Sequence, residues 1–262
     1  MNLSLKGKRA IVCGSTQGIG KSIAIKFAEN GASVTLIARN ENKLKNVINE
    51  LSDINSNKHN YIVSDFNDID ILEKNFTDYL GKGFKPSILI NNTGGPPPGE
   101  ISKASKKDFE NYMSMHLHTS HYLSTSLLPI MKKEKYGRIV NIISVSVKAP
   151  IDNLGVSNTV RWAMASWAKT LSNEVAKDGI TVNNILPGFT DTERLRSLLK
   201  NRALASKTTI KEITNNTISN IPARRFGKPE EVADATTFLC SKAANYINGI
   251  NLPIDGGFSK SL

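Results

Sequence analysis

Long apolar segments and cysteines are both scarce in this chain of 262 residues. No stretch approaches the roughly 20 apolar residues of a membrane-spanning helix, and Met1 to Lys8 contain no apolar region of the kind found in signal peptides. The two cysteines, Cys13 and Cys240, do not have the spacing of a metal motif. These absences predict a reduced cytoplasmic protein without a membrane segment.

Aromatic residues are also few, at 6% of the chain, although the formal net charge is +11. The 34 basic residues are dispersed, and no aromatic side chains interleave them as they do in platforms for single-stranded nucleic acid. We therefore expect no nucleic-acid partner. The positive charge instead favours attraction of an anionic cofactor or a small anionic substrate.

Histidine is rare as well, but His116, His118 and His121 lie within six residues of one another. In a helix, only His118 and His121 would share a face. No carboxylate or cysteine lies beside them at the spacing of metal ligands. We therefore predict no metal site.

What the chain does contain is a regular alternation of short apolar runs and segments with helical periodicity. Strands are expected at 10–13, 33–38, 61–64, 87–91, 138–143, 181–186 and 251–254; helices are expected after the first strand and at 40–51, 68–80, 106–133, 156–177 and 229–239. This βαβ repetition predicts an α/β fold in one domain over residues 1–262, a Rossmann-type doubly wound parallel sheet in a three-layer αβα arrangement. Ligands of such sheets bind outside the carboxyl ends of the strands.

The first expected strand is followed by Gly14, Gly18 and Gly20 and then by a helix. Glycines allow a sharp turn and a close approach to a ligand, and the N-terminus of a helix offers N–H groups to an anion. The spacing G-x-x-x-G-x-G differs from the common G-x-G-x-x-G fingerprint. The stretch is typical of a site for a dinucleotide pyrophosphate, although a tight loop that packs a helix on a strand would need similar glycines.

Further motifs follow in a fixed order along the chain. They are Cys-Gly-Ser-Thr-Gln-Gly-Ile-Gly at 13–20, Asp65, Asn-Asn-Thr-Gly at 91–94, Gly-Arg-Ile-Val-Asn-Ile-Ile-Ser at 137–144, Val-Asn-Asn-Ile-Leu-Pro-Gly at 182–188, Thr192 and Pro-Ile-Asp-Gly-Gly at 253–257. From about Leu5 to Gly257 the chain resembles the short-chain dehydrogenase/reductase family, and it is most similar to the 3-oxoacyl-carrier-protein reductase-like branch. The resemblance implies a nicotinamide cofactor, a small-molecule substrate and a homo-oligomer, a tetramer or dimer.

The resemblance also implies a set of cofactor-binding residues. These are Gly14, Ser15, Thr16, Gln17, Gly18, Ile19, Gly20, Arg39, Asp65, Phe66, Asn91, Asn92, Thr93, Gly94, Pro187, Gly188, Thr190 and Thr192. The glycines would surround the pyrophosphate, Asp65 would meet the adenine, and Thr192 would hold the nicotinamide end. Helix capping is the alternative role for both Asp65 and Thr192.

The choice of cofactor depends on the end of the second expected strand. An acidic residue there would bind the ribose hydroxyls of NAD, but the chain has Ala38 followed by Arg39. No carboxylate would repel a 2′-phosphate, and a guanidinium can bind it as a fork. We therefore predict NADP rather than NAD.

The catalytic motif of the family is altered. The family uses a serine, then a Tyr-x-x-x-Lys pair, often with an asparagine from the preceding helix. Ser144 fits the serine, but Ser157 and Arg161 occupy the places of tyrosine and lysine, and His116 occupies that of asparagine. Serine is a much weaker acid than tyrosine, whose reference pKa is about 10, and arginine stays protonated. His116 is a candidate replacement for proton transfer.

Three functions remain open at this stage. The leading one is an NADP-dependent oxidoreductase that acts on a carbonyl or alcohol substrate with an altered proton-donor site. The alternative is a binding or regulatory protein that keeps the cofactor but has lost turnover; a lyase, isomerase or dehalogenase-like activity is the third. Residues 190–221 are expected to form a substrate lid, and the Gly/Pro loop 94–99 is either a wall of the substrate site or a rigid turn.

Overall fold

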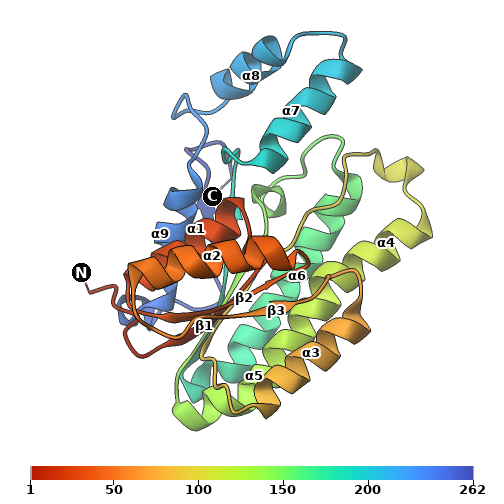
Figure 1. Ribbon diagram of the computed structural model, residues 1–262. Coiled ribbons are helices and arrows are strands. Elements are labelled where there is room, and N and C mark those ends of the chain that lie inside the picture. The colour runs from red at the N-terminus through yellow and green to blue at the C-terminus, as the bar shows by residue number, and fades with distance from the viewer. Residues whose placement is uncertain (1, 262) are drawn as a thin grey trace.

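Seven parallel strands form one twisted sheet in the order β3-β2-β1-β4-β5-β6-β7 (Figure 1). The structure, a computed structural model, describes residues 2–261. The strands are β1 (Arg9–Cys13), β2 (Ser33–Ala38), β3 (Asn60–Val63), β4 (Ile88–Asn91), β5 (Gly137–Ile142), β6 (Ile180–Pro187) and β7 (Asn251–Ile254). The predicted Rossmann-type α/β fold is confirmed, and every expected strand is present within one or two residues. The order of strands reverses between β1 and β4, where such sheets bind ligands.

Helices cover both faces of the sheet (Figure 1). One face packs against α1 (Gly18–Glu29), α2 (Glu41–Ile54) and α9 (Pro229–Cys240), and the other against α3 (Ile69–Gly81), α5 (Thr119–Glu134) and α6 (Gly155–Val175). Neighbouring strand residues alternate between these two layers: Ile11 packs with the second layer and Val12 with the first. Burial on both faces explains why the strands read as continuous apolar runs.

The expected helix 106–133 is interrupted. The chain forms α4 (Lys106–Met113), then one π-helical turn at Ser114–His118, and then α5. A π turn places one extra residue in the helix. In this turn the His116 side chain points inward and is 2% exposed, whereas His118 and His121 are exposed. The three histidines therefore do not converge, and residues 2–261 contain no cluster of three metal-ligating side chains.

Four asparagines in register cross the central strands. Asn91 on β4 donates to Asn141 on β5, Asn141 donates to Asn184 on β6, and Asn184 donates to Asn251 on β7, each at 2.8 Å. Each pair is directly opposed in the sheet register. Because a buried amide costs free energy unless it is hydrogen-bonded, this ladder accounts for the presence of these asparagines inside the sheet.

Residues 190–221 project beyond the carboxyl edge of the sheet as two helices (Figure 1). These are α7 (Glu193–Ala205) and α8 (Ile210–Ser219). Thr192 is the N-cap of α7, with its hydroxyl accepting a hydrogen bond from the Leu195 N–H at 3.3 Å, and Thr209 caps α8. Short 3-10 helices occur at Ile101–Lys103, Val145–Val147, Ala176–Asp178 and Lys242–Ala244. In the described chain, the helices all fall short of the length and apolarity that crossing a membrane requires.

Candidate active site

A cavity of about 690 Å³ opens at the carboxyl ends of the strands. This volume is in the range of ordinary cofactor and ligand sites. Its walls come from the loops after β1, β2, β3, β4 and β5, from the first two turns of α6, and from α7. The cavity lies at the point where the strand order reverses, as expected for this type of sheet.

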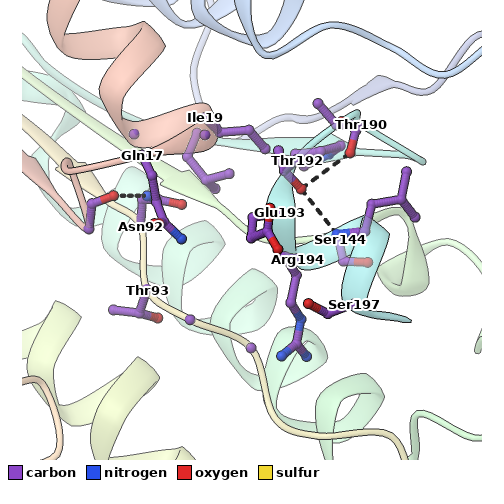
Figure 2. Close-up of a pocket in the computed structure, with 18 of the residues that line it drawn as sticks. Gln17, Ile19, Asn92, Thr93, Ser144, Thr190, Thr192, Glu193, Arg194 and Ser197 are labelled. Carbon is purple, nitrogen blue, oxygen red and sulfur yellow. Dashed lines mark hydrogen bonds between the residues drawn. The ribbon is translucent and has the colours of Figure 1, made fainter. Parts of the chain in front are cut away.

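The glycine loop lies in the middle of the cavity, between the residues after β2 and β3 on one side and those after β4 and β5 on the other. Gly14 and Gly18 have φ values of +56° and +55°, a conformation that favours glycine. The Asn92 side chain donates to the carbonyl oxygens of Cys13 at 3.1 Å and Gly14 at 3.2 Å, which ties the end of β4 to the loop (Figure 2). The N-cap of α1, Gln17, makes no side-chain cap hydrogen bond, so the first N–H groups of α1 remain available. This cradle fits the pyrophosphate of a dinucleotide.

The end of β2 forms the wall next to the glycine loop. Arg39, with its side chain 77% exposed, lies 3.8 Å from the Asp65 carboxylate, and Lys43 on the first turn of α2 faces the same space. Asp65 accepts hydrogen bonds from the backbone and side chain of Asn67 at 3.0 and 2.9 Å. The Asp65 carboxylate comes from the end of β3, whereas β2 itself ends in Ala38 and is followed by two cations, which suits a phosphate on the adenosine ribose.

Ser144, Ser157 and Arg161 line the far end of the cavity together. The Ser144 hydroxyl accepts a hydrogen bond from the Ser146 N–H at 3.1 Å, so its own proton is free to be donated. Ser157 lies in the first turn of α6 and Arg161 one turn later. Arg161 is 8% exposed and donates to the Ile142 carbonyl at 3.0 Å. Burial, with a contribution from Arg194, lowers the pKa of Arg161 to about 10.

His116 lies behind this wall rather than on it. Its Nδ1 is 2.6 Å from the hydroxyl of Thr93, which itself lines the cavity. Burial first, and then the positive charges of Arg161 and Arg194, hold the pKa of His116 well below its usual value. The imidazole is therefore neutral near pH 7, and it interacts with two residues that line the cavity, through the Thr93 hydroxyl and the Gly94 backbone.

Nearly all of the site residues expected from the sequence line this cavity. They are Gly14, Thr16, Gln17, Gly18, Ile19, Gly20, Arg39, Asp65, Phe66, Asn92, Thr93, Gly94, Ser144, Ser157, Arg161, Pro187, Gly188, Thr190 and Thr192. The exceptions are Ser15, Asn91 and His116. Ser15 is fully buried beneath the loop, and the Asn91 side chain belongs to the asparagine ladder. These three do not present a side chain to the cavity.

The sequence did not point to Arg194, which the structure places in the cavity wall (Figure 2). Arg194 lies in the first turn of α7 and donates to the carbonyl of Pro96. Its position follows from Thr192, because a capping threonine fixes where the helix begins and which residues enter its first turn. Lys43, Met115, Leu154, Ser197 and Arg202 also line the cavity without having been singled out.

Comparisons with known proteins agree with this geometry. The family model described as enoyl-(acyl carrier protein) reductase matches residues 14–259. The 3-oxoacyl-(acyl-carrier-protein) reductase FabG of Vibrio cholerae is 32% identical over 257 residues, which cover 97% of this chain and 98% of the relative.

Solved structures with the same fold include two reductases. The NADPH-dependent reductase YwfH, involved in bacilysin biosynthesis, is 28% identical, with a TM-score of 0.92 and coverage of 97% of this chain and 99% of that chain. The L-sorbose reductase of Gluconobacter frateurii, complexed with NADPH and L-sorbose, is 28% identical, with a TM-score of 0.93 and full coverage of both chains, 100% each. The chain therefore belongs to the enoyl-(acyl carrier protein) reductase family of short-chain dehydrogenases/reductases, in the 3-oxoacyl-acyl-carrier-protein reductase-like branch, and is an NAD(P)-dependent oxidoreductase.

Proposed function

We propose that the protein is an NADP-dependent oxidoreductase that reduces the carbonyl group of a small molecule at an altered proton-donor site. One observation carries this proposal: a single cavity joins the glycine loop to Ser144, Ser157 and Arg161. A cofactor seated on the glycine loop would therefore share one space with these three side chains.

NADP, rather than NAD, is supported by the residues at the end of β2. Arg39 and Lys43 supply two positive charges there, and Ala38 leaves the position without a carboxylate. The solved reductases named above are described with NADPH. Glycine-loop residues and the free N-terminus of α1 would hold the pyrophosphate, and Pro187, Gly188 and Thr190 would border the nicotinamide.

The catalytic contribution of the chain is mainly electrostatic in this proposal. NADPH held on the glycine loop would supply the hydride for the carbonyl carbon. Ser144 would donate a hydrogen bond to the carbonyl oxygen, and Arg161 would stabilise the negative charge that develops there. The proton that completes the alcohol would then come from water. Ser157 lies within the same space but offers only a weakly acidic hydroxyl. Loss of an efficient general acid typically removes about 10²–10⁴-fold in rate, so we expect slow turnover on unactivated ketones.

The direct test is NADPH binding by fluorescence titration, followed by NADPH oxidation across a panel of carbonyl compounds. Binding together with oxidation of at least one compound is the expected result. Binding without oxidation of any compound would support the rival function, a cofactor-binding regulatory protein, which is favoured by the lack of a tyrosine on the wall of the described cavity. No NADPH binding would contradict both.

A double variant tests the altered proton-donor site. Ser157→Tyr with Arg161→Lys restores the residue types of the family at these two positions. If the missing acid limits turnover, the double variant should reduce simple ketones faster than the parent. An unchanged rate with intact NADPH binding would show that the proton-donor explanation is wrong.

Three further expectations belong to the same proposal. Residues 190–221 form the lid, since Leu195, Leu198 and Arg202 of α7 face the cavity. Homo-oligomerisation through the long helices is supported by Trp162, whose side chain lies on α6 and is 49% exposed; light scattering in solution would measure it. A cytoplasmic location is compatible with Cys13 and Cys240, which are both free and buried.

A further inference from the structure

Two arginines from different helices meet beside Gly95. Arg161 comes from α6 and Arg194 from α7. A Cβ atom built on Gly95 would lie 3.4 Å from Nη2 of Arg161 and 3.4 Å from Nη2 of Arg194, so both guanidinium groups border the same point. Figure 2 shows the Arg194 side chain extending from its helix toward the loop that follows Thr93. Both arginines line the cavity.

Among the described residues, no acidic side chain forms an ion pair with either guanidinium. Arg161 is buried and Arg194 is more exposed, but two like charges held close together still destabilise each other, and burial, with a contribution from Arg194, lowers the pKa of Arg161 to about 10. The folded chain by itself leaves this repulsion uncompensated.

The hydrogen bonds of the pair are also incomplete. Arg161 donates to the carbonyl of Ile142, and Arg194 donates to the carbonyl of Pro96. The Arg161 Nε is buried without a hydrogen-bond partner. Each guanidinium has five N–H donors in a planar fork that matches a carboxylate or phosphate. Several donors therefore remain for an anion that the chain does not itself provide.

The position of the pair separates it from the phosphate sites of the cofactor. The pyrophosphate cradle is built from residues 14–20 at the N-terminus of α1, and the 2′-phosphate would meet Arg39 at the end of β2. Arg161 instead lies one turn after Ser157, in the part of the cavity where the substrate would react. His116, which lies behind Thr93, is neutral and therefore cannot balance the two positive charges.

We infer that Arg161 and Arg194 together bind an anionic group of the substrate, a carboxylate or a phosphate, so that the enzyme selects an acidic carbonyl compound over a neutral one. This inference rests on the proposed function. It assigns Arg194 a role in substrate specificity, and it makes the lid helix α7 part of the substrate site rather than only a cover. An anion bound between the two helices would draw α7 toward α6.

Paired probes that differ only in charge provide the test. Pyruvate, acetoacetate and levulinate place the carboxylate at increasing distance from the carbonyl, and the methyl ester of each is its neutral match. Dihydroxyacetone phosphate and dihydroxyacetone form the phosphate pair. Calorimetric titration uses the protein saturated with NADP⁺, which cannot reduce the probe, and in parallel the cofactor-free protein. We expect at least one acid to bind tenfold or more tightly than its neutral match, and the series that responds identifies carboxylate or phosphate.

Variants then locate the binding. Arg194→Met should weaken binding of the preferred acid at least tenfold and leave the neutral match unchanged. Arg161→Lys, which keeps a positive charge in the buried position, should weaken it less than Arg161→Met. Arg196→Met is the matched control, because it also removes one positive charge from α7. The Arg196 side chain itself is 63% exposed and pairs with Asp191. Circular dichroism and NADPH affinity report whether each variant is folded.

Several outcomes would overturn the inference. They are equal affinity for the acids and their neutral matches, no binding of any of the anions to either form of the protein, and no effect of Arg194→Met. Loss of NADP⁺ affinity in Arg194→Met to the same extent as loss of acid binding would assign the pair to the cofactor instead. Failure of the proposed function would be seen separately. In that case no NADPH oxidation would occur, but the cofactor-free protein would still bind the acid more tightly than its ester.

Discussion

Gly20 lies so close to Gly14 that a Cβ atom at Gly20 would be 2.2 Å from the Gly14 carbonyl oxygen. The same Cβ would be 2.7 Å from the Asn92 side-chain nitrogen, which holds the loop to the end of β4. The glycine spacing of the loop is therefore a packing requirement as well as a way to expose backbone N–H groups. Helix α1 can begin at the cavity only because this contact is possible.

Gly20→Ala should destabilise the protein and abolish tight NADPH binding. The added methyl group meets backbone atoms that cannot rotate away, and overpacking of this kind typically costs about 1–3 kcal/mol. Urea unfolding and fluorescence titration measure the two effects. Gly81→Ala is the control, because Gly81 ends α3 and an added Cβ would have no neighbour within 4 Å; it should leave NADPH affinity unchanged. A Gly20→Ala variant with parental stability and affinity would refute the packing argument.

Asn141→Ala should be among the more destabilising substitutions in the sheet. Asn141 is fully buried, and its removal leaves the Asn91 donor and the Asn184 acceptor without partners. An unsatisfied buried polar group costs about 1–3 kcal/mol, so we expect a loss of about 2–5 kcal/mol in the free energy of unfolding. Asn251→Ala removes only the exposed end of the ladder, and water can replace its bond. A loss there equal to that of Asn141→Ala would show that the ladder does not act as a buried network.

The strands and most helices could be predicted because their signals are local. Continuous apolar runs such as 10–13 and the stop at Gly179 reflect burial and backbone freedom that neighbouring residues already specify. The place of the loop 14–20 in the cavity wall was likewise predictable, since Gly14 and Gly18 adopt positive φ values that favour glycine.

The substrate half was less predictable for physical reasons. Arg194 reaches the cavity only because α7 folds back over the carboxyl edge of the sheet, and its partner Arg161 lies 33 positions earlier along the chain. His116 has the chemistry of a proton donor, but a π-helical turn directs it behind Thr93. Neither the register of a lid helix nor a single π turn leaves a clear periodic signal in the sequence.

The stability of the protein should fall as the pH drops below about 6.5, partly through His116. Burial, reinforced by Arg161 and Arg194, holds the pKa of His116 well below its usual value in the folded state. The unfolded chain takes up the proton near the ordinary histidine pKa of about 6.5, so below that pH the unfolded state binds more protons and is favoured. The contribution approaches about 1.4 kcal/mol per pH unit until the folded pKa is reached.

The comparison of parent with His116→Asn isolates this contribution. Asparagine retains a polar atom near Thr93 but does not titrate. His59 has a lowered pKa from burial too, but it is present in both proteins and cancels in the difference. Urea unfolding at pH 7.5 and pH 5 should show a smaller loss of stability in the variant. Parallel losses in the two proteins would mean that His116 takes up its proton over the same pH range in the folded and unfolded states, and that its pKa is not lowered by folding.

Arg39→Met should change the choice between cofactors. Arg39 is the exposed cation at the end of β2, where its guanidinium can bind the 2′-phosphate as a fork. Its removal should raise the Kd for NADPH about tenfold, which corresponds to about 1.4 kcal/mol and is a usual magnitude for one charge-assisted contact. The Kd for NADH should stay the same, because NADH has no phosphate at this position. Lys45→Met serves as the control, since Lys45 lies nearby on α2 and pairs with Glu41 but does not line the cavity. If Arg39→Met weakened NADPH and NADH equally, Arg39 would contact a part common to both cofactors, and the preference for NADP would have to come from Lys43 or be absent.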